Sequence, residues 1–129
     1  MTTIDIEPYR AFWQKRAKAT LPPEMYPQRE NGRAEANRLA KILVEEFGVE
    51  RVYLFGSYAW GITLRPNSDL DLAVVGLEGA KFWRAYGRLE KATTYAFDLV
   101  ELDGLPHYLH SRILESEILL YDGSKSFTV

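Results

Sequence analysis

The run SDLDLAVV, residues 68–75, places two aspartates inside an apolar, strand-like stretch. Side chains two apart on a strand point to the same face, so Asp69 and Asp71 are expected to project together, with the leucines beside them facing the opposite layer. A carboxylate is costly to bury, and two such charges at close range repel each other. The stretch therefore predicts a strand that begins at an acidic site, where a cation compensates the pair.

Apolar spacing elsewhere predicts alternating helices and strands. Between residues 33 and 47 apolar side chains recur at the helical period, which predicts a helix capped by Asn31 and stopped by Gly48. The remaining predicted helices are 9–19, 57–61, 80–91 and 106–114, and the predicted strands are 51–55, 70–75, 96–102 and an edge strand at 117–121. This order predicts an α/β or α+β fold, in which a small mixed sheet has helices packed on it.

The stretch LPPEMYPQRENG holds three prolines within six residues and ends in an Asn-Gly pair. Proline disfavours helix interiors and central strands, so this stretch predicts an irregular connector. We therefore expect two parts: residues 1–32, an N-terminal helix with its proline-rich connector, and residues 33–129, one folded domain. Tyr9, Phe12 and Trp13 of the N-terminal helix are expected to pack on the domain or on a second copy in a homodimer.

Composition excludes several classes of protein. The sequence has no cysteine, which rules out disulfides and thiolate chemistry. No apolar run approaches the roughly 18–20 residues that span a bilayer, and the N-terminus lacks the pattern of a signal peptide, so a cytoplasmic protein without membrane contact is expected. The net charge of −2 does not favour nucleic acid, including RNA, as a partner.

A third acidic residue stands alone in another predicted strand. Asp98 is the only charge in AFDLV, residues 96–100, and it would join the first two aspartates if the two strands are neighbours. The cation expected for such an all-oxygen site is Mg²⁺ or Mn²⁺. Three carboxylates that hold divalent metals are the machinery of phosphoryl and nucleotidyl transfer, in which one metal activates the attacking oxygen and the other neutralises the leaving pyrophosphate.

A Gly-Ser pair follows the first predicted strand. Gly56 allows a sharp turn and a close approach of the backbone to a ligand. Ser57 then opens the short predicted helix, whose free N–H groups suit a phosphate. One side of the predicted site would therefore bind a triphosphate, and the other side would hold metal.

These elements, FGSYAWG, SDLDL and FDLVEL in that order, resemble the signature of the polymerase-β-like nucleotidyltransferase superfamily. The likeness is closest to the minimal nucleotidyltransferases of prokaryotes and runs from about residue 33 to 121. It implies a nucleotidyltransferase palm in residues 33–129 and Mg²⁺-dependent transfer of a nucleoside monophosphate, usually AMP from ATP, to a protein or RNA acceptor. It also implies a HEPN-type partner, toward which many such proteins act as the antitoxin.

The resemblance also implies a role for each motif residue. Asp69 and Asp71 would be catalytic metal ligands. Asp98 would be the third ligand and the base for the acceptor hydroxyl. Gly56 and Ser57 would hold the β- and γ-phosphates of the nucleotide.

One departure from the family pattern concerns phosphate. Many members carry arginines in a GSRARG-like run, whereas this chain reads GSYAWG, with Tyr58 and Trp60 in their place. Phosphate must then be neutralised from elsewhere, and Arg65 is the candidate.

Two other functions stay open at this point. The chain could be an antitoxin that masks its toxin by binding, with weak or vestigial catalysis. It could also be an antibiotic nucleotidyltransferase of the aminoglycoside kind, which would need a further helical region from a second copy or a partner. The other polar features are interpreted as solvated or partly packed surface: His107, His110 and the basic stripe of Lys81, Arg84, Arg88 and Lys91.

Overall fold

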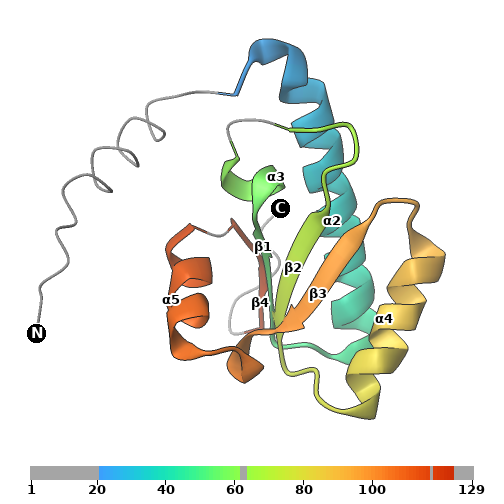
Figure 1. Ribbon diagram of the computed structural model, residues 1–129. Helices are drawn as coiled ribbons and strands as arrows, with labels where there is room; N and C mark the ends of the chain where they lie inside the picture. The colour runs from blue at the N-terminus through green and yellow to red at the C-terminus, as the bar shows by residue number, and fades with distance from the viewer. Residues whose placement is uncertain (1–20, 62–63, 117, 124–129) are drawn as a thin grey trace, which may run out of the picture.

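Four short strands form one sheet in the part of the chain that the structure describes: Arg51–Phe55 (β1), Leu70–Val75 (β2), Phe97–Glu101 (β3) and Ile118–Asp122 (β4). The structure is a computed structural model, and it describes residues 21–61, 64–116 and 118–123. The strand order is β3-β2-β1-β4 (Figure 1). β1 is antiparallel to both of its neighbours, whereas β2 and β3 are parallel, so the sheet is mixed as predicted.

Helices cover both faces of this sheet. They are Tyr26–Phe47 (α2), Ser57–Trp60 (α3), Ala80–Ala92 (α4) and His107–Ser116 (α5), with 3₁₀ turns at Pro23–Met25 (η1) and Leu102–Gly104 (η2). α2 and α4 lie on one face, α5 lies on the other, and α3 sits where β1 ends (Figure 1). The predicted α+β architecture, a small mixed sheet with helices packed on it, is confirmed.

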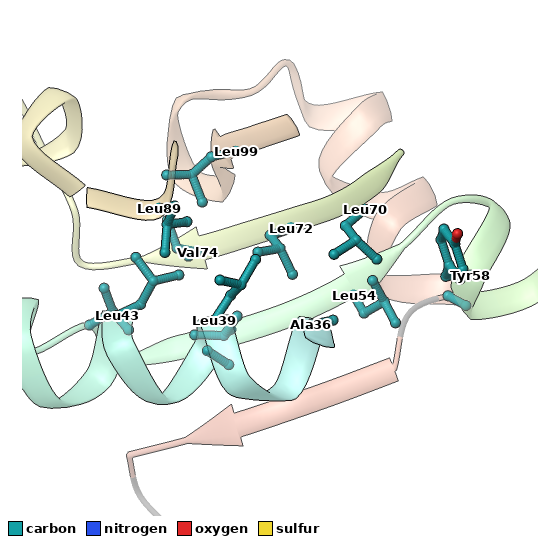
Figure 2. Close-up of a cluster of buried hydrophobic side chains, with 14 of the residues drawn as sticks. Ala36, Leu39, Leu43, Leu54, Tyr58, Leu70, Leu72, Val74, Leu89 and Leu99 are labelled. Carbon is teal, nitrogen blue, oxygen red and sulfur yellow. The ribbon is translucent and has the colours of Figure 1, made fainter. Parts of the chain in front are cut away.

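The main core lies between the sheet and the α2/α4 layer. Leu39 and Leu43 of α2 are fully buried against strand residues that include Leu54 and Leu72 (Figure 2). Side chains alternate along a strand, so the residues between these core positions must face α5 instead. A second, smaller cluster forms there: Tyr53, Ala73, Leu102 and Ile113.

The helix over residues 33–47 begins earlier than predicted. α2 starts at Tyr26, so the predicted connector ends before that residue, and Asn31 lies inside the helix instead of capping it. Pro27 is tolerated because it stands in the first turn, where its missing N–H would have no helical partner. The predicted stop at Gly48 is confirmed, since that residue adopts a left-handed conformation with φ of 64° and donates to the helix end.

The predicted part boundary between residues 32 and 33 therefore falls within α2. The aromatic helix predicted at residues 9–19 lies outside the described residues, and its packing and a homodimer stay predictions. Among the described helices, none is both long and apolar enough to cross a membrane.

Candidate active site

The sheet brings two of the predicted aspartates together. Asp71 of β2 and Asp98 of β3 are direct partners in the parallel ladder, which confirms that these strands are neighbours. Both lie on the α5 face, because Leu72 and Leu99, the next residues along each strand, belong to the core on the opposite face. Asp69 comes one residue before β2 and is exposed.

Asp71 is the electrostatic centre of this acidic group. Its side chain is half-buried, whereas those of Asp69 and Asp98 are exposed. Burial, followed by the nearby negative charges of Asp98 and Asp69, raises the pKa of Asp71 to about 6. Ionisation of this carboxyl group is therefore less favourable in the folded protein than in water, and a positive charge close to it would reverse that effect.

The chemistry of these donors fits a hard divalent cation. In the described part of the chain, no three acidic or histidine side chains form a closed metal cluster. Mg²⁺ does not need one, since it keeps several of its waters and uses one or two carboxylates together with substrate phosphates. Asp71 has two such carboxylates near it, those of Asp98 and Asp69, and the repulsion that they exert on its charge is what a cation would relieve.

Gly56 connects this acidic group to the loop after β1. It has φ of 75° and ψ of −151°, a conformation open in practice to glycine alone. A β-carbon at this position would overlap the side-chain oxygen Oδ2 of Asp71. The backbone of residue 56 therefore lies directly against the carboxylate, so a ligand held by this loop would sit beside the aspartates.

Gly56→Ala is expected to weaken nucleotide binding by more than about tenfold, or 1.4 kcal/mol, because the loop must move away from Asp71. Backbone strain should also lower the free energy of unfolding by about 1–3 kcal/mol. Calorimetry with an ATP analogue checks the first effect, and urea unfolding checks the second.

Gly79→Ala is the matched control, because Gly79 has a similar conformation, φ of 61° and ψ of −135°, with nothing within 4 Å of an added β-carbon. It should lower stability but leave nucleotide affinity unchanged. If wild type and Gly56→Ala bound the ATP analogue with equal affinity, the loop at Gly56 would not be the one that contacts the phosphates.

The residues after Gly56 form the short helix α3. Ser57 is its first residue, as predicted, although its side chain makes no capping hydrogen bond. Tyr58 is only 2% exposed, and its ring fills the space beside Gly32 of α2, where a β-carbon would overlap it. The position of Tyr58, at which the resemblance leads one to expect arginine, is thus a core position here. The side chain of Trp60 lies outside what the structure describes.

Arg65 stands in the turn that leads into the acidic strand, and its side chain is exposed. Its backbone N–H donates to Ser68 Oγ at 2.9 Å, and its carbonyl accepts from Gln28 Nε2 at 2.6 Å. These contacts fix the turn that carries Asp69. The predicted contact of the Arg65 side chain with phosphate stays a prediction, as do the phosphate contacts of Gly56 and Ser57.

Sequence reasoning missed one residue at this site. Arg33 of α2 donates to two backbone carbonyls of α3, those of Tyr58 and Ala59. No motif surrounds it in the sequence, and only the folded structure brings α2 and α3 together.

Two residues that were interpreted as surface have ordinary surface contacts. Nε2 of His110 lies 3.8 Å from Oδ1 of Asp103. Arg88 of the basic stripe forms a salt bridge with Glu46.

Without metal, Asp71→Asn is expected to stabilise the protein above pH 6 by roughly 1–2 kcal/mol, a value reduced for partial solvent exposure. The pKa of Asp71 is higher in the folded state than its ordinary value of 3.8, so the folded state binds the extra proton. Wild-type stability therefore falls as pH rises from about 4 to 6, and the asparagine variant escapes this loss.

Urea unfolding in EDTA between pH 4 and 8 measures the difference between the two proteins. The difference in free energy of unfolding should disappear as the pH falls toward 4. It should also become smaller in excess Mg²⁺ at pH 7.5, because the cation is expected to stabilise the wild type more than the variant. A gap that does not change with pH would contradict the electrostatic explanation.

Comparisons with known proteins identify a family and similar solved structures. Residues 37–126 match the family described as polymerase beta, nucleotidyltransferase. A solved structure assigned to the minimal nucleotidyltransferases is 33% identical, with a TM-score of 0.57, over 70% of this chain and 93% of that chain. No curated protein sequence matches significantly.

Two further structures come from toxin–antitoxin complexes. One, a toxin–antitoxin with AMP-PNP, is 27% identical with a TM-score of 0.56, over 67% of this chain and 73% of that chain. The other, a tri-AMPylated Shewanella oneidensis HEPN toxin in complex with MNT antitoxin, is 24% identical with a TM-score of 0.55, over 70% of this chain and 72% of that chain. At that identity the second likeness concerns the fold alone.

Proposed function

This chain belongs to the polymerase β nucleotidyltransferase family, and from that premise we propose that it transfers AMP from ATP to a protein acceptor with the help of Mg²⁺. The observation that carries the proposal is the contact between two motifs. The carboxylate of Asp71 lies against the backbone of Gly56 and in register with Asp98. A nucleotide whose phosphates approach that loop would meet the carboxylates from the same side.

Each motif residue has a distinct task in the proposed reaction. Asp69 and Asp71 would hold Mg²⁺, which supplies positive charge against the triphosphate. Gly56 admits the phosphates because it has no side chain, and Ser57 offers its N–H and hydroxyl beside them. Asp98 is exposed, which leaves it open to an acceptor hydroxyl on the free side of the site.

The bond changes follow from these positions. The acceptor oxygen forms a bond to the α-phosphorus of ATP, and the bond from that phosphorus to the bridging oxygen breaks. Pyrophosphate leaves with the electron pair, and the hydroxyl proton passes to the carboxylate of Asp98. AMP remains attached to the acceptor through a phosphodiester.

The proposed acceptor is a HEPN-type toxin partner. Support comes from the similar structure that is a toxin–antitoxin with AMP-PNP, at 27% identity. The tri-AMPylated toxin of the Shewanella oneidensis complex is an acceptor of the kind that we propose here. In this proposal, transfer of AMP to the toxin is how the chain acts as an antitoxin.

The test is a pull-down from the native host, followed by incubation with Mg²⁺ and radiolabelled ATP. Label at the α-phosphate should appear on a co-purified protein, whereas label at the γ-phosphate should not. Mass spectrometry should find AMP on one of its side chains. Label from the γ-phosphate alone would mean phosphorylation and would contradict the proposal.

The same experiment tests the main alternative. A partner that is captured reproducibly but takes up no label, even with fresh ATP and Mg²⁺, would favour an antitoxin that works by masking. With an aminoglycoside added to the same incubation, an antibiotic as acceptor would instead give a labelled small molecule and no labelled protein.

A further inference from the structure

Helix α3 is too short to satisfy its own backbone. In a helix the last carbonyls have no partner within the helix, and in one of only four residues this applies to nearly all of them. The carbonyl of Gly56 accepts from Ala59 N–H at 3.1 Å, and the carbonyl of Ser57 accepts from Gly61 N–H at 2.9 Å. Among the described residues, the next two carbonyls, those of Tyr58 and Ala59, accept from a side chain of another helix.

Arg33 of α2 supplies both donors. Its Nε donates to the carbonyl of Tyr58 at 2.7 Å, and its Nη2 donates to the carbonyl of Ala59 at 2.9 Å. The guanidinium is planar and presents its N–H groups as a rigid fork, so two such bonds fix the orientation of the helix end as well as its position. A cation at a helix C-terminus is also favoured by the helix dipole.

The neighbouring residue of α2 strengthens this attachment. Gly32 leaves room for the ring of Tyr58, which is buried there. Two adjacent residues of α2 thus hold α3: Gly32 packs against the ring of Tyr58, and Arg33 donates to two carbonyls. α2 itself is a long helix with a buried face, so it is a rigid support for this attachment.

The loop that carries Gly56 is therefore fixed from two sides. On one side it touches the carboxylate of Asp71, and on the other side α3 is bound to α2. Gly56 directly precedes α3, so any shift of that helix moves the backbone that faces the aspartates. A displacement of about 1 Å in such a site can lower activity by about 10²-fold.

We infer that Arg33 is a positioning residue, which holds α3 by its two carbonyls so that the backbone of Gly56 and Ser57 meets the nucleotide phosphates beside Asp71. It acts through the loop and not on phosphate itself. The inference rests on the proposed function, because it assigns Arg33 to the same nucleotide site.

The experiment compares Arg33→Met and Arg33→Lys with the control Arg38→Met in the full chain. Arg38 lies on the same helix and also donates to a carbonyl of another helix, that of Ala92 at 2.5 Å. Its other hydrogen bonds go to Glu35 of α2, so none of these bonds involves α3. Hydrogen exchange is measured at the amides of Ala59 and Gly61. Calorimetry then measures the affinity for α,β-methylene ATP, a non-cleavable analogue, with Mg²⁺.

Arg33→Met should speed exchange at both amides by about tenfold or more, and it should weaken analogue binding by about 5–20-fold. Arg33→Lys should fall between Arg33→Met and wild type, because lysine keeps the charge and can donate to a single carbonyl. Arg38→Met should change neither the exchange at these amides nor the affinity.

Unchanged exchange in Arg33→Met would overturn the inference, and so would faster exchange with unchanged affinity. Weaker binding with unchanged exchange would also overturn it, because that pattern belongs to a direct phosphate ligand. Failure of the wild-type protein to bind the analogue would overturn the proposed function instead. The exchange measurement needs no nucleotide, so it distinguishes the two failures.

Discussion

Asp71→Asn is expected to lower AMP transfer by about 10³-fold or more while the protein stays folded. Asp71 is the carboxylate that lies against Gly56 and beside Asp98, so it faces both the phosphates and the metal of the proposed site. A metal that neutralises a transferring phosphoryl group contributes several kcal/mol, and about 1.4 kcal/mol corresponds to each tenfold change in rate. The asparagine keeps the size of the side chain but removes the charge that holds the cation.

The measurement is single-turnover transfer of label from α-labelled ATP to the co-purified acceptor. Mg²⁺-dependent affinity for α,β-methylene ATP should fall in the same variant, because the metal travels with the triphosphate. Asp103→Asn is a suitable control, since Asp103 is exposed in η2 at the other end of β3. Near-normal transfer by Asp71→Asn would remove the basis of the proposed function.

Asp98→Asn is expected to separate binding from chemistry. Asp98 is exposed and pairs with Asp71 from the neighbouring strand, which suits a group that takes the proton from an acceptor. Loss of a general base lowers the rate by about 10²–10⁴-fold. Affinity for Mg²⁺ and the ATP analogue should change only a fewfold, because Asp69 and Asp71 remain.

This pattern would appear as a lower kcat with nearly unchanged nucleotide affinity. If Asp98→Asn lost nucleotide affinity as strongly as Asp71→Asn, both residues would serve the metal and the base would lie elsewhere.

The sheet and its acidic group were accessible from sequence because each depends on local pattern. The strands β1, β2 and β3 are short β-rich runs, and glycines stand directly after the first two. Asp71 and Asp98 were recognisable because a single charge in an apolar strand is unfavourable unless it has a task. Their pairing then required only that β2 and β3 be neighbours.

The contacts around Gly56 and α3 could not be predicted from local sequence pattern. Tyr58 stands in a motif position, and only the space beside Gly32 shows that it belongs to the core. Arg33 acts on backbone carbonyls that are distant in sequence, which no residue pattern encodes. The start of α2 was misplaced because proline is a helix breaker in the interior but is accepted in the first turn, and Pro27 occupies the first turn.

The parallel pairing of β2 and β3 has a consequence for folding during synthesis on the ribosome. Parallel neighbours need a crossover, and here the whole of α4 is synthesised between Asp71 and Asp98. A nascent chain that ends before β3 has Asp71 but not its partner, so the acidic pair arises only late in translation. The pairing of Asp71 with Asp98 is therefore a property of the finished topology. The proposed transfer needs both residues, so it can report whether a truncated or misthreaded chain has completed its crossover.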